Sequence, residues 1–136
     1  MNVTVSIEVP EGVQRFAHLF ASAGFRPLLV GGAVRDAVRA RLTGVGFEAS
    51  DFDFEVFGAT LDELVAVLRR SGRQVDEVGR AFGVLKVSDR EFGHFDVAVP
   101  RLDNRVGAGH RGFEVETPAD IDVFTAASRR DFTVNA

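Results

Sequence analysis

The 136-residue chain contains no cysteine, tryptophan or tyrosine, and its only lysine is Lys86. Without cysteine the chain can form neither a disulfide nor a thiolate zinc site, so any bound metal must use oxygen or nitrogen ligands. No apolar run approaches the roughly 20 residues of a membrane-spanning helix. The N-terminus also lacks the basic region and apolar stretch of a secretory signal. We therefore expect a cytoplasmic protein with no membrane partner.

Lysine is scarce as well, since 15 of the 16 basic residues are arginine, and the 20 acidic residues give a net charge of -4. A protein that coats duplex nucleic acid would be basic, so any nucleic-acid contact is expected to be a local patch. The arginine excess fits either bidentate phosphate recognition or simply GC-rich coding. With 46% hydrophobic and 26% charged residues, the composition indicates a globular chain. The length suits one compact domain, residues 1–136.

Hydrophobic periodicity predicts helices interleaved with strands. Expected helices are residues 10–23, residues 33–40, a helix that Thr60 opens and Gly72 ends, and a helix from 117 to about 129. Expected strands are residues 26–30, 51–57, 74–78, 84–87 and 92–99. Residues 100–117 are rich in glycine and arginine, which predicts a mobile basic loop. This order favours an α/β or α+β domain with a small mixed β-sheet flanked by helices.

Two aspartates, Asp51 and Asp53, alternate with phenylalanines at the start of an expected strand. Residues two apart in a strand point to the same side, so both carboxylates can converge on one cation. Oxygen ligands of this kind suit Mg²⁺, which usually binds one or two carboxylates together with substrate phosphates. The alternative interpretation is a solvated strand face.

A Gly31-Gly32 pair follows the apolar strand 26–30 and opens a helix. In this arrangement, backbone N–H groups and the helix dipole can bind phosphate, and glycine lets the main chain approach the anion. Arg35, one turn into the helix, could add a charged donor. A Gly-Gly turn is also a common structural device with no ligand.

Two further groups of polar residues are candidates. Asp96 lies among strand residues, and an acid in a central strand requires a partner or a metal, whereas on an edge strand it would face solvent. Near the C-terminus, Arg129 and Arg130 either complement a helix dipole or, with Asn135, contact the sugar and phosphates of a nucleotide.

Five segments together resemble the head domain of bacterial tRNA nucleotidyltransferases (CCA-adding enzymes) and the related poly(A) polymerases. They occur in the order seen in that family: 31–36 (GGAVRD), 51–58 (DFDFEVFG), 79–84 (GRAFGV), 109–113 (GHRGF) and 129–136 (RRDFTVNA). The resemblance spans about residues 10–136. It implies membership of the DNA polymerase beta superfamily of nucleotidyltransferases, whose catalytic domain is a mixed sheet flanked by helices.

The resemblance implies a role for each candidate residue. Asp51, Asp53 and Asp96 are expected to be catalytic and to bind two Mg²⁺ ions, with Asp96 alternatively accepting the hydroxyl proton. Nucleotide-binding residues are expected to be Gly31, Gly32, Arg35, Arg129, Arg130 and Asn135. Asp36 is expected to serve as a helix-turn or salt-bridge residue, and Lys86 as sheet scaffold close to the site.

The implied reaction is template-independent transfer of NMP from CTP or ATP to the 3′-hydroxyl of tRNA or another RNA, with release of pyrophosphate. Family members continue into neck, body and tail domains that select the base and grip tRNA. We expect these to be absent from a chain that stops at Ala136, so RNA affinity should be weak. The alternative is a nucleotide- and Mg²⁺-binding module that is inactive without those domains or a partner chain.

Overall fold

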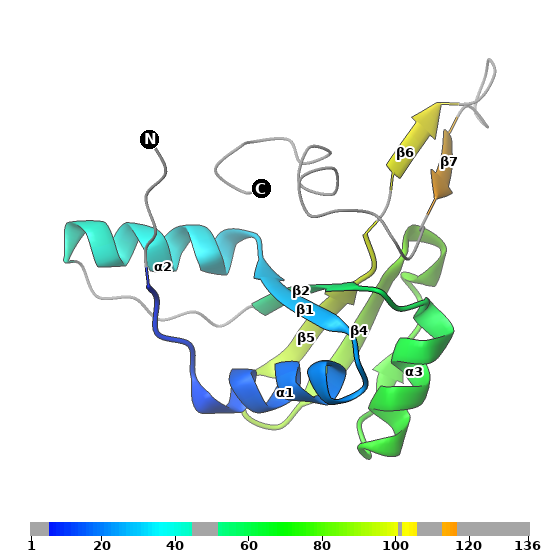
Figure 1. Ribbon diagram of the computed structural model, residues 1–136, viewed down its shortest axis with the longest axis horizontal. Helices are drawn as coiled ribbons and strands as arrows, with labels where there is room; N and C mark the ends of the chain where they lie inside the picture. The colour runs from blue at the N-terminus through cyan, green and yellow to red at the C-terminus, as the bar shows by residue number, and fades with distance from the viewer. Residues whose placement is uncertain (1–5, 45–51, 101, 106–112, 117–136) are drawn as a thin grey trace.

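The computed structural model describes residues 6–44, 52–100, 102–105 and 113–116 (Figure 1). In chain order the elements are α1 (Glu11–Ser22), β1 (Arg26–Val30), α2 (Gly32–Thr43), β2 (Phe52–Phe57), α3 (Leu61–Arg70), β3 (Val75–Asp76), the short 3₁₀ helix η1 (Arg80–Phe82), β4 (Val84–Asp89), β5 (Gly93–Ala98), β6 (Leu102–Arg105) and β7 (Phe113–Glu116). None of the described helices is both long and apolar enough to span a membrane.

The main sheet has five strands in the order β1-β2-β5-β4-β3. Strand β5 is therefore central, and it pairs in parallel with β2 and antiparallel with β4. The outer pairs, β1 with β2 and β3 with β4, are antiparallel. The sheet is thus mixed, as the order of helical and strand patterns predicts.

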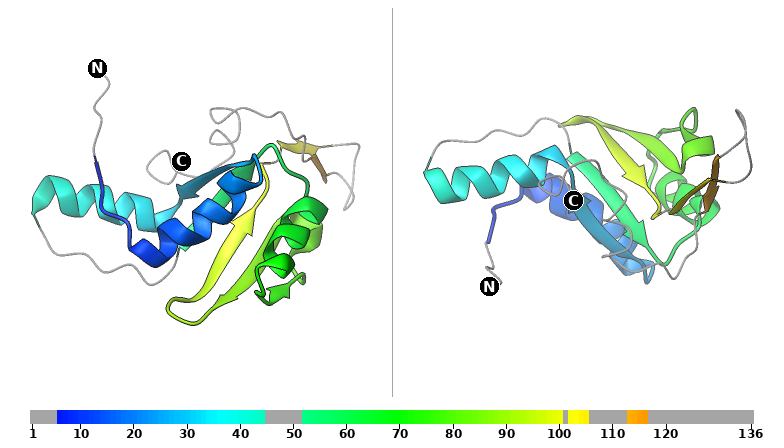
Figure 2. Two further views of the ribbon diagram at one scale, coloured as in Figure 1. Left: turned by 60° about the horizontal axis from the view of Figure 1, so that its bottom comes forward. Right: turned by 90° about the horizontal axis from the view of Figure 1, so that it is seen from above.

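The core lies between one face of this sheet and the helices α1 and α3. Helix α1 contributes Val13, Phe16 and Phe20, which are spaced so that they share one side of the helix. The Phe16 ring stacks on Phe95 of β5 with 4.2 Å between centroids and meets Phe20 edge-on at 5.3 Å. Figure 2 shows both helices against the sheet and α2 projecting away from it. The opposite face of the sheet carries the Asp53 and Glu55 side chains of β2, of which Glu55 is buried.

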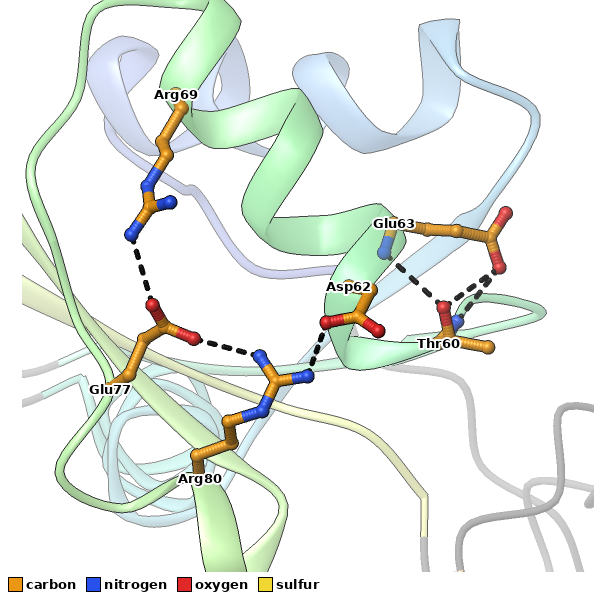
Figure 3. Close-up of polar contacts among 6 residues, drawn as sticks. All are labelled: Thr60, Asp62, Glu63, Arg69, Glu77 and Arg80. Atoms are coloured by element: carbon orange, nitrogen blue, oxygen red, sulfur yellow. Dashed lines mark hydrogen bonds and ion pairs between the residues drawn. The ribbon is translucent and has the colours of Figure 1, made fainter.

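Helix α3 begins with the capping box that its sequence predicts. The Thr60 hydroxyl accepts a hydrogen bond from the Glu63 N–H at 3.2 Å, and the Glu63 carboxylate accepts one from the Thr60 N–H at 3.1 Å. Figure 3 shows this pair beside a chain of ion pairs in which Glu77 accepts from Arg69 and Arg80, and Arg80 also binds Asp62. These contacts fasten α3 to the segment that precedes β4. The hydrogen bonds to Asp62 and Glu77 raise the pKa of Arg80.

The structure corrects two expectations about strands. Residues 100–117 were expected to form a loop, but Leu102–Arg105 and Phe113–Glu116 are antiparallel strands that pair Leu102 with Glu116. Phe113–Glu116 alternates apolar and polar residues but Leu102–Arg105 does not, and Gly107, Gly109 and Gly112 favoured a loop. The strand expected over 74–78 is reduced to Val75–Asp76. The helix expected over 117–129 lies outside the described residues.

Candidate active site on the face of the sheet opposite the core

The two described aspartates that the sequence singles out lie next to each other in the sheet. Asp53 of β2 is the register partner of Asp96 in the parallel strand β5. Register partners on neighbouring strands point to the same face, and their backbones are about 4.8 Å apart. Because Phe52, Phe54, Phe95 and Val97 fill the core, Asp53 and Asp96 point to the other face. Asp51 lies outside the described residues, so its position relative to this pair stays a prediction.

The environment of Asp96 differs from that of an ordinary surface carboxylate. It is half-buried in the central strand, and its Oδ1 atom is buried with no hydrogen-bond partner in the described parts of the chain. A buried carboxylate oxygen without a partner is costly, so such an oxygen is suited to binding a cation. Of the two placements that the sequence leaves open for Asp96, a central strand or an edge strand, the structure has the central one.

The Gly31-Gly32 turn lies against Asp53. Gly31 precedes α2 with a φ of 82°, which side chains other than glycine rarely tolerate. A Cβ at Gly31 would lie 3.1 Å from Asp53 Oδ2, closer than side chains normally approach. Glycine is therefore needed here both for its conformation and for its small size. The turn brings the first N–H groups of α2 to the same side of the sheet edge as the Asp53 carboxylate.

Arg35 adds a positive charge at the start of the same helix. A Cβ on Gly32 would lie 3.4 Å from an Arg35 terminal nitrogen, so the guanidinium folds back toward the helix N-terminus. Arg35 Nε also donates to Asp36 at 3.0 Å, and this hydrogen bond lowers the pKa of the Asp36 carboxyl. Asp36 thus forms a salt bridge with Arg35, one of the two roles expected for it. Backbone donors and a guanidinium together make this helix terminus suited to phosphate.

One buried acid was not singled out from the sequence. Glu55 shares the face of Asp53, since it is two residues along β2, and it is only 2% exposed. It lies between its register partners Leu28 of β1 and Ala98 of β5. The alternation of acidic and apolar residues over 51–57 is typical of a strand with one solvated face, so no local signal indicated that Glu55 is buried.

The described residues fit an oxygen-ligated metal but do not complete its site. Within the described ranges, no group of three or more His, Cys, Asp or Glu side chains could hold a metal ion. Asp53 and Asp96 nevertheless present two adjacent carboxylates, one with an unbonded buried oxygen, and carboxylates are the ligands that Mg²⁺ prefers. Arg129, Arg130 and Asn135 lie outside the described residues, and their expected roles stay predictions.

Comparison with known proteins agrees with this geometry. The multifunctional CCA protein of Acidovorax sp. (strain JS42) is 39% identical over 109 residues, covering 79% of this chain and 22% of the relative. The CCA-adding enzyme of Bordetella pertussis is 36% identical over 115 residues, covering 84% of this chain and 27% of the relative. The chain thus spans about a quarter of the length of these relatives.

A solved structure and a family model lead to the same assignment. A tRNA nucleotidyltransferase complexed with a primer tRNA and an incoming ATP analog superposes with a TM-score of 0.58 at 26% identity, covering 88% of this chain and 29% of that one. Residues 28–136 match the model of the poly(A) polymerase head domain. The mixed sheet, the glycine turn and the paired aspartates thus occur in a chain that belongs to the poly(A) polymerase head-domain family.

Proposed function

We propose that this chain is the catalytic head of an RNA nucleotidyltransferase, which transfers NMP from CTP or ATP to the 3′-hydroxyl of tRNA or another RNA. The observation that supports this most directly is the closeness of the phosphate-type glycine turn to the Asp53 carboxylate, whose Oδ2 would lie 3.1 Å from a Cβ at Gly31, with Asp96 beside Asp53. Nucleotidyl transfer needs an anion site and a cation site next to each other, because the reacting phosphate must touch both. The similar solved structure, a tRNA nucleotidyltransferase complexed with a primer tRNA, makes tRNA the first RNA to test.

The nucleotide triphosphate would bind at the start of α2. The N–H groups after Gly31 and the Arg35 guanidinium supply donors for its non-bridging oxygens. Arg129, Arg130 and Asn135 are proposed as further nucleotide contacts, following the family resemblance. Rigid donors of this kind hold the α-phosphate in place and stabilise the negative charge that develops on the departing pyrophosphate.

The carboxylates would hold the divalent metal. Asp53 and Asp96, together with Asp51, are proposed to bind two Mg²⁺ ions, which polarise the phosphoryl group and ease deprotonation of the RNA hydroxyl. In the reaction the 3′-oxygen bonds to the α-phosphorus while the bond from that phosphorus to the pyrophosphate oxygen breaks. The hydroxyl proton leaves to a carboxylate, for which Asp96 is the candidate, or to water.

A second function is favoured by the length of the relatives. Because the chain spans about a quarter of the curated proteins that it matches, it could bind nucleotide and metal yet depend on further chain for turnover. In that case CTP and ATP bind with Mg²⁺, but no nucleotide is incorporated.

An incorporation assay separates the two functions. Labelled CTP or ATP is offered with Mg²⁺ and a tRNA that lacks its 3′ end, and label in the RNA is measured. We expect Asp53→Ala to abolish incorporation while its far-ultraviolet circular dichroism matches the wild type. Unchanged incorporation by Asp53→Ala would refute the site. Calorimetric binding of NTP with and without Mg²⁺ then identifies a module that binds but does not turn over.

A further inference from the structure

The candidate site belongs to a row of residues that crosses the sheet. Val30 of β1, which precedes Gly31, is the register partner of Asp53 in β2. Asp53 in turn pairs with Asp96 of β5, and Asp96 pairs with Lys86 of β4. Directly opposed residues share a face, and neighbouring strands are about 4.8 Å apart. The order across this face is therefore the glycine turn, the two carboxylates and Lys86.

Lys86 is a cation that no acid of the described residues holds. Its side chain is exposed, and within the described ranges it forms neither a hydrogen bond nor an ion pair. On its far side it is opposed by Asp76 of β3, whose Oδ1 atom accepts a hydrogen bond from the Val78 N–H at 2.9 Å. The arginines that fasten α3 differ, because they are bound to acidic side chains. The Lys86 ammonium is thus available to an anionic ligand.

The sheet around Lys86 carries further accessible hydrogen-bond donors. Ser88, two residues along β4, is exposed, and its register partner His94 of β5 is half-buried. Alternate residues of a strand point to the same side, so both lie on the face of Lys86, while Leu85 and Val87 fill the core. Hydroxyl, imidazole and ammonium groups donate to phosphate and sugar oxygens. The β4–β5 part of this face therefore suits a polyanion such as a nucleic-acid strand.

The chemistry of nucleotidyl transfer decides from which side each substrate comes. The attacking 3′-oxygen and the departing pyrophosphate oxygen lie roughly in line, on opposite sides of the α-phosphorus. The triphosphate is proposed to bind at the start of α2, which follows β1 directly, so the pyrophosphate leaves toward β1. The RNA hydroxyl then approaches over β5 and β4. Its own 5′ phosphodiester is one sugar away, and Lys86 is one strand, about 4.8 Å, beyond Asp96.

We propose that Lys86 binds the last phosphodiester of the RNA acceptor strand, and that Ser88 and His94 line the path of that strand. The inference rests on the proposed function, because the direction of the RNA follows from the triphosphate site at α2. Lys86 is a positioning residue: it holds the terminal nucleotide with its hydroxyl toward the carboxylates and takes no part in bond making. A phosphate contact carries no sequence information, so the strand is held here without base preference.

RNA affinity is the first test. Binding of a labelled tRNA that lacks its 3′ end is measured by fluorescence anisotropy with the whole chain and Mg²⁺, without NTP. Lys86→Gln is expected to raise the Kd about three- to tenfold, and Lys86→Arg, which keeps the charge, to stay within about twofold of the wild type. Melting temperatures should match the wild type, because the exposed Lys86 side chain has no bonded partner among the described residues. An unchanged Kd for Lys86→Gln overturns the proposal.

The matched control is Arg70→Gln. Arg70 is an exposed cation in the last turn of α3, on the other face of the sheet. Removing it changes the net charge of the chain by the same amount and should alter the Kd for RNA by less than about twofold. Equal losses for Lys86→Gln and Arg70→Gln would mean that only net charge matters, which overturns a contact at Lys86.

The salt dependence of binding tests whether the contact is to a phosphate. Each phosphate contact on a single strand contributes about 0.7 to the slope of log K against log salt concentration. Lys86→Gln is expected to lower the slope by about that amount, and Arg70→Gln to leave it unchanged. A weaker affinity at an unchanged slope would show that Lys86 acts through the fold and not on the backbone of the RNA, so the proposal would be wrong.

The absence of cysteine allows the contact to be mapped. Lys86→Cys and Arg70→Cys each introduce one thiol, and saturating RNA with a haloacetyl group on its last phosphodiester is added with Mg²⁺. Thioether formation is followed by mass spectrometry. Lys86→Cys is expected to react at least about tenfold faster than Arg70→Cys, because the bound RNA holds the reactive group beside it. Equal rates would place the RNA end elsewhere and overturn the proposal.

Kinetic constants separate failure of this inference from failure of the proposed function. In the incorporation assay, Lys86→Gln should raise KM for RNA about three- to tenfold and leave KM for NTP within about twofold. If the wild type incorporates nucleotide and KM for NTP rises instead, Lys86 contacts the triphosphate, and only the inference is lost. If the wild type binds NTP but neither binds RNA nor incorporates nucleotide, the proposed catalytic function fails, and the inference fails with it.

Discussion

Two aspartates of the β4–β5 hairpin, Asp89 at its turn and Asp96 at its centre, have opposite surroundings. Asp89 accepts hydrogen bonds from the N–H groups of Glu91 and Phe92 and from Arg73, each at 2.9 Å. Asp96 keeps a buried oxygen that no described residue binds. The turn thus uses its carboxylate to hold the fold, while the centre of the sheet presents one that a ligand can use. Within one hairpin, Asp89 therefore contributes to stability, and Asp96 is available for function.

The largest stability effect is expected at the turn. Asp89→Asn removes the charge that three donors share, and hydrogen bonds to charged groups are the stronger ones. We expect the free energy of unfolding to fall by about 2–3 kcal/mol in urea denaturation. Metal and nucleotide binding should be unchanged under conditions where the variant is folded. A loss below about 0.5 kcal/mol would show that the turn does not depend on this carboxylate.

The pH dependence of stability gives a control for the same residue. Burial would raise the pKa of Asp89, but the N–H of Phe92, the Arg73 guanidinium and the N–H of Glu91 outweigh it, so the pKa is lowered. A carboxyl whose folded pKa is lowered adds stability above its unfolded pKa of about 3.9 and loses it as the pH falls through the folded value. The gap between wild type and Asp89→Asn should therefore narrow below about pH 4.

An intermediate loss of folding stability is expected when Gly31 of the glycine turn is replaced. Gly31→Ala forces a side chain into a φ of 82° with a ψ of -153°, a region that almost only glycine adopts and that costs other residues about 1–3 kcal/mol. Its Cβ also crowds Asp53 Oδ2. Gly44→Ala is the matched control, because Gly44 has a φ of 74° and nothing within 4 Å of the added Cβ. Both variants should lose stability in urea, but only Gly31→Ala should weaken metal and NTP binding in calorimetry. If Gly31→Ala and Gly44→Ala bound metal and NTP equally well, the glycine turn would not be part of the binding site.

A smaller loss of folding stability is expected when the N-terminal cap of α3 is removed. Thr60→Ala removes the hydroxyl of the capping box, and such changes cost about 1 kcal/mol. Thermal unfolding should show the loss, and Thr60→Ser should restore most of the stability. Because α3 lies on the core side of the sheet, NTP binding should not change. Reduced NTP binding by folded Thr60→Ala would mean that the two faces of the sheet are coupled.

The smallest stability effect is expected at Asp96. Asp96→Asn removes a charge from a half-buried position, so in EDTA the free energy of unfolding should stay within about 0.5 kcal/mol of the wild type or rise. Metal binding should be lost. A large loss of stability would show that Asp96 holds the fold in the same way as Asp89, and the contrast between the two would disappear.

The elements with strong local patterns were predictable from the sequence. Strand β1 has the expected bounds, and the Thr60 capping box is present, because both depend on neighbouring residues. Strand β6 was missed because Leu102–Arg105 has no apolar alternation, and β7 because four alternating residues carry less signal than the clustered glycines before them. The register that sets Lys86 opposite Asp96 and Asp76 depends on pairing between strands, which no local pattern encodes. The adjacency of Asp53 and Asp96 was expected only through the family resemblance.

The parallel pairing of β2 with β5 has a consequence for how the site forms. Hairpins such as β4–β5 close over a few residues, whereas the β2–β5 pairing brings together segments separated in sequence by α3, β3, η1 and β4. Loop closure of this length is entropically expensive, and such non-local contacts slow folding. The two carboxylates therefore meet only when distant parts of the chain have assembled, and a proteolytic fragment with just one of them would carry half of the pair.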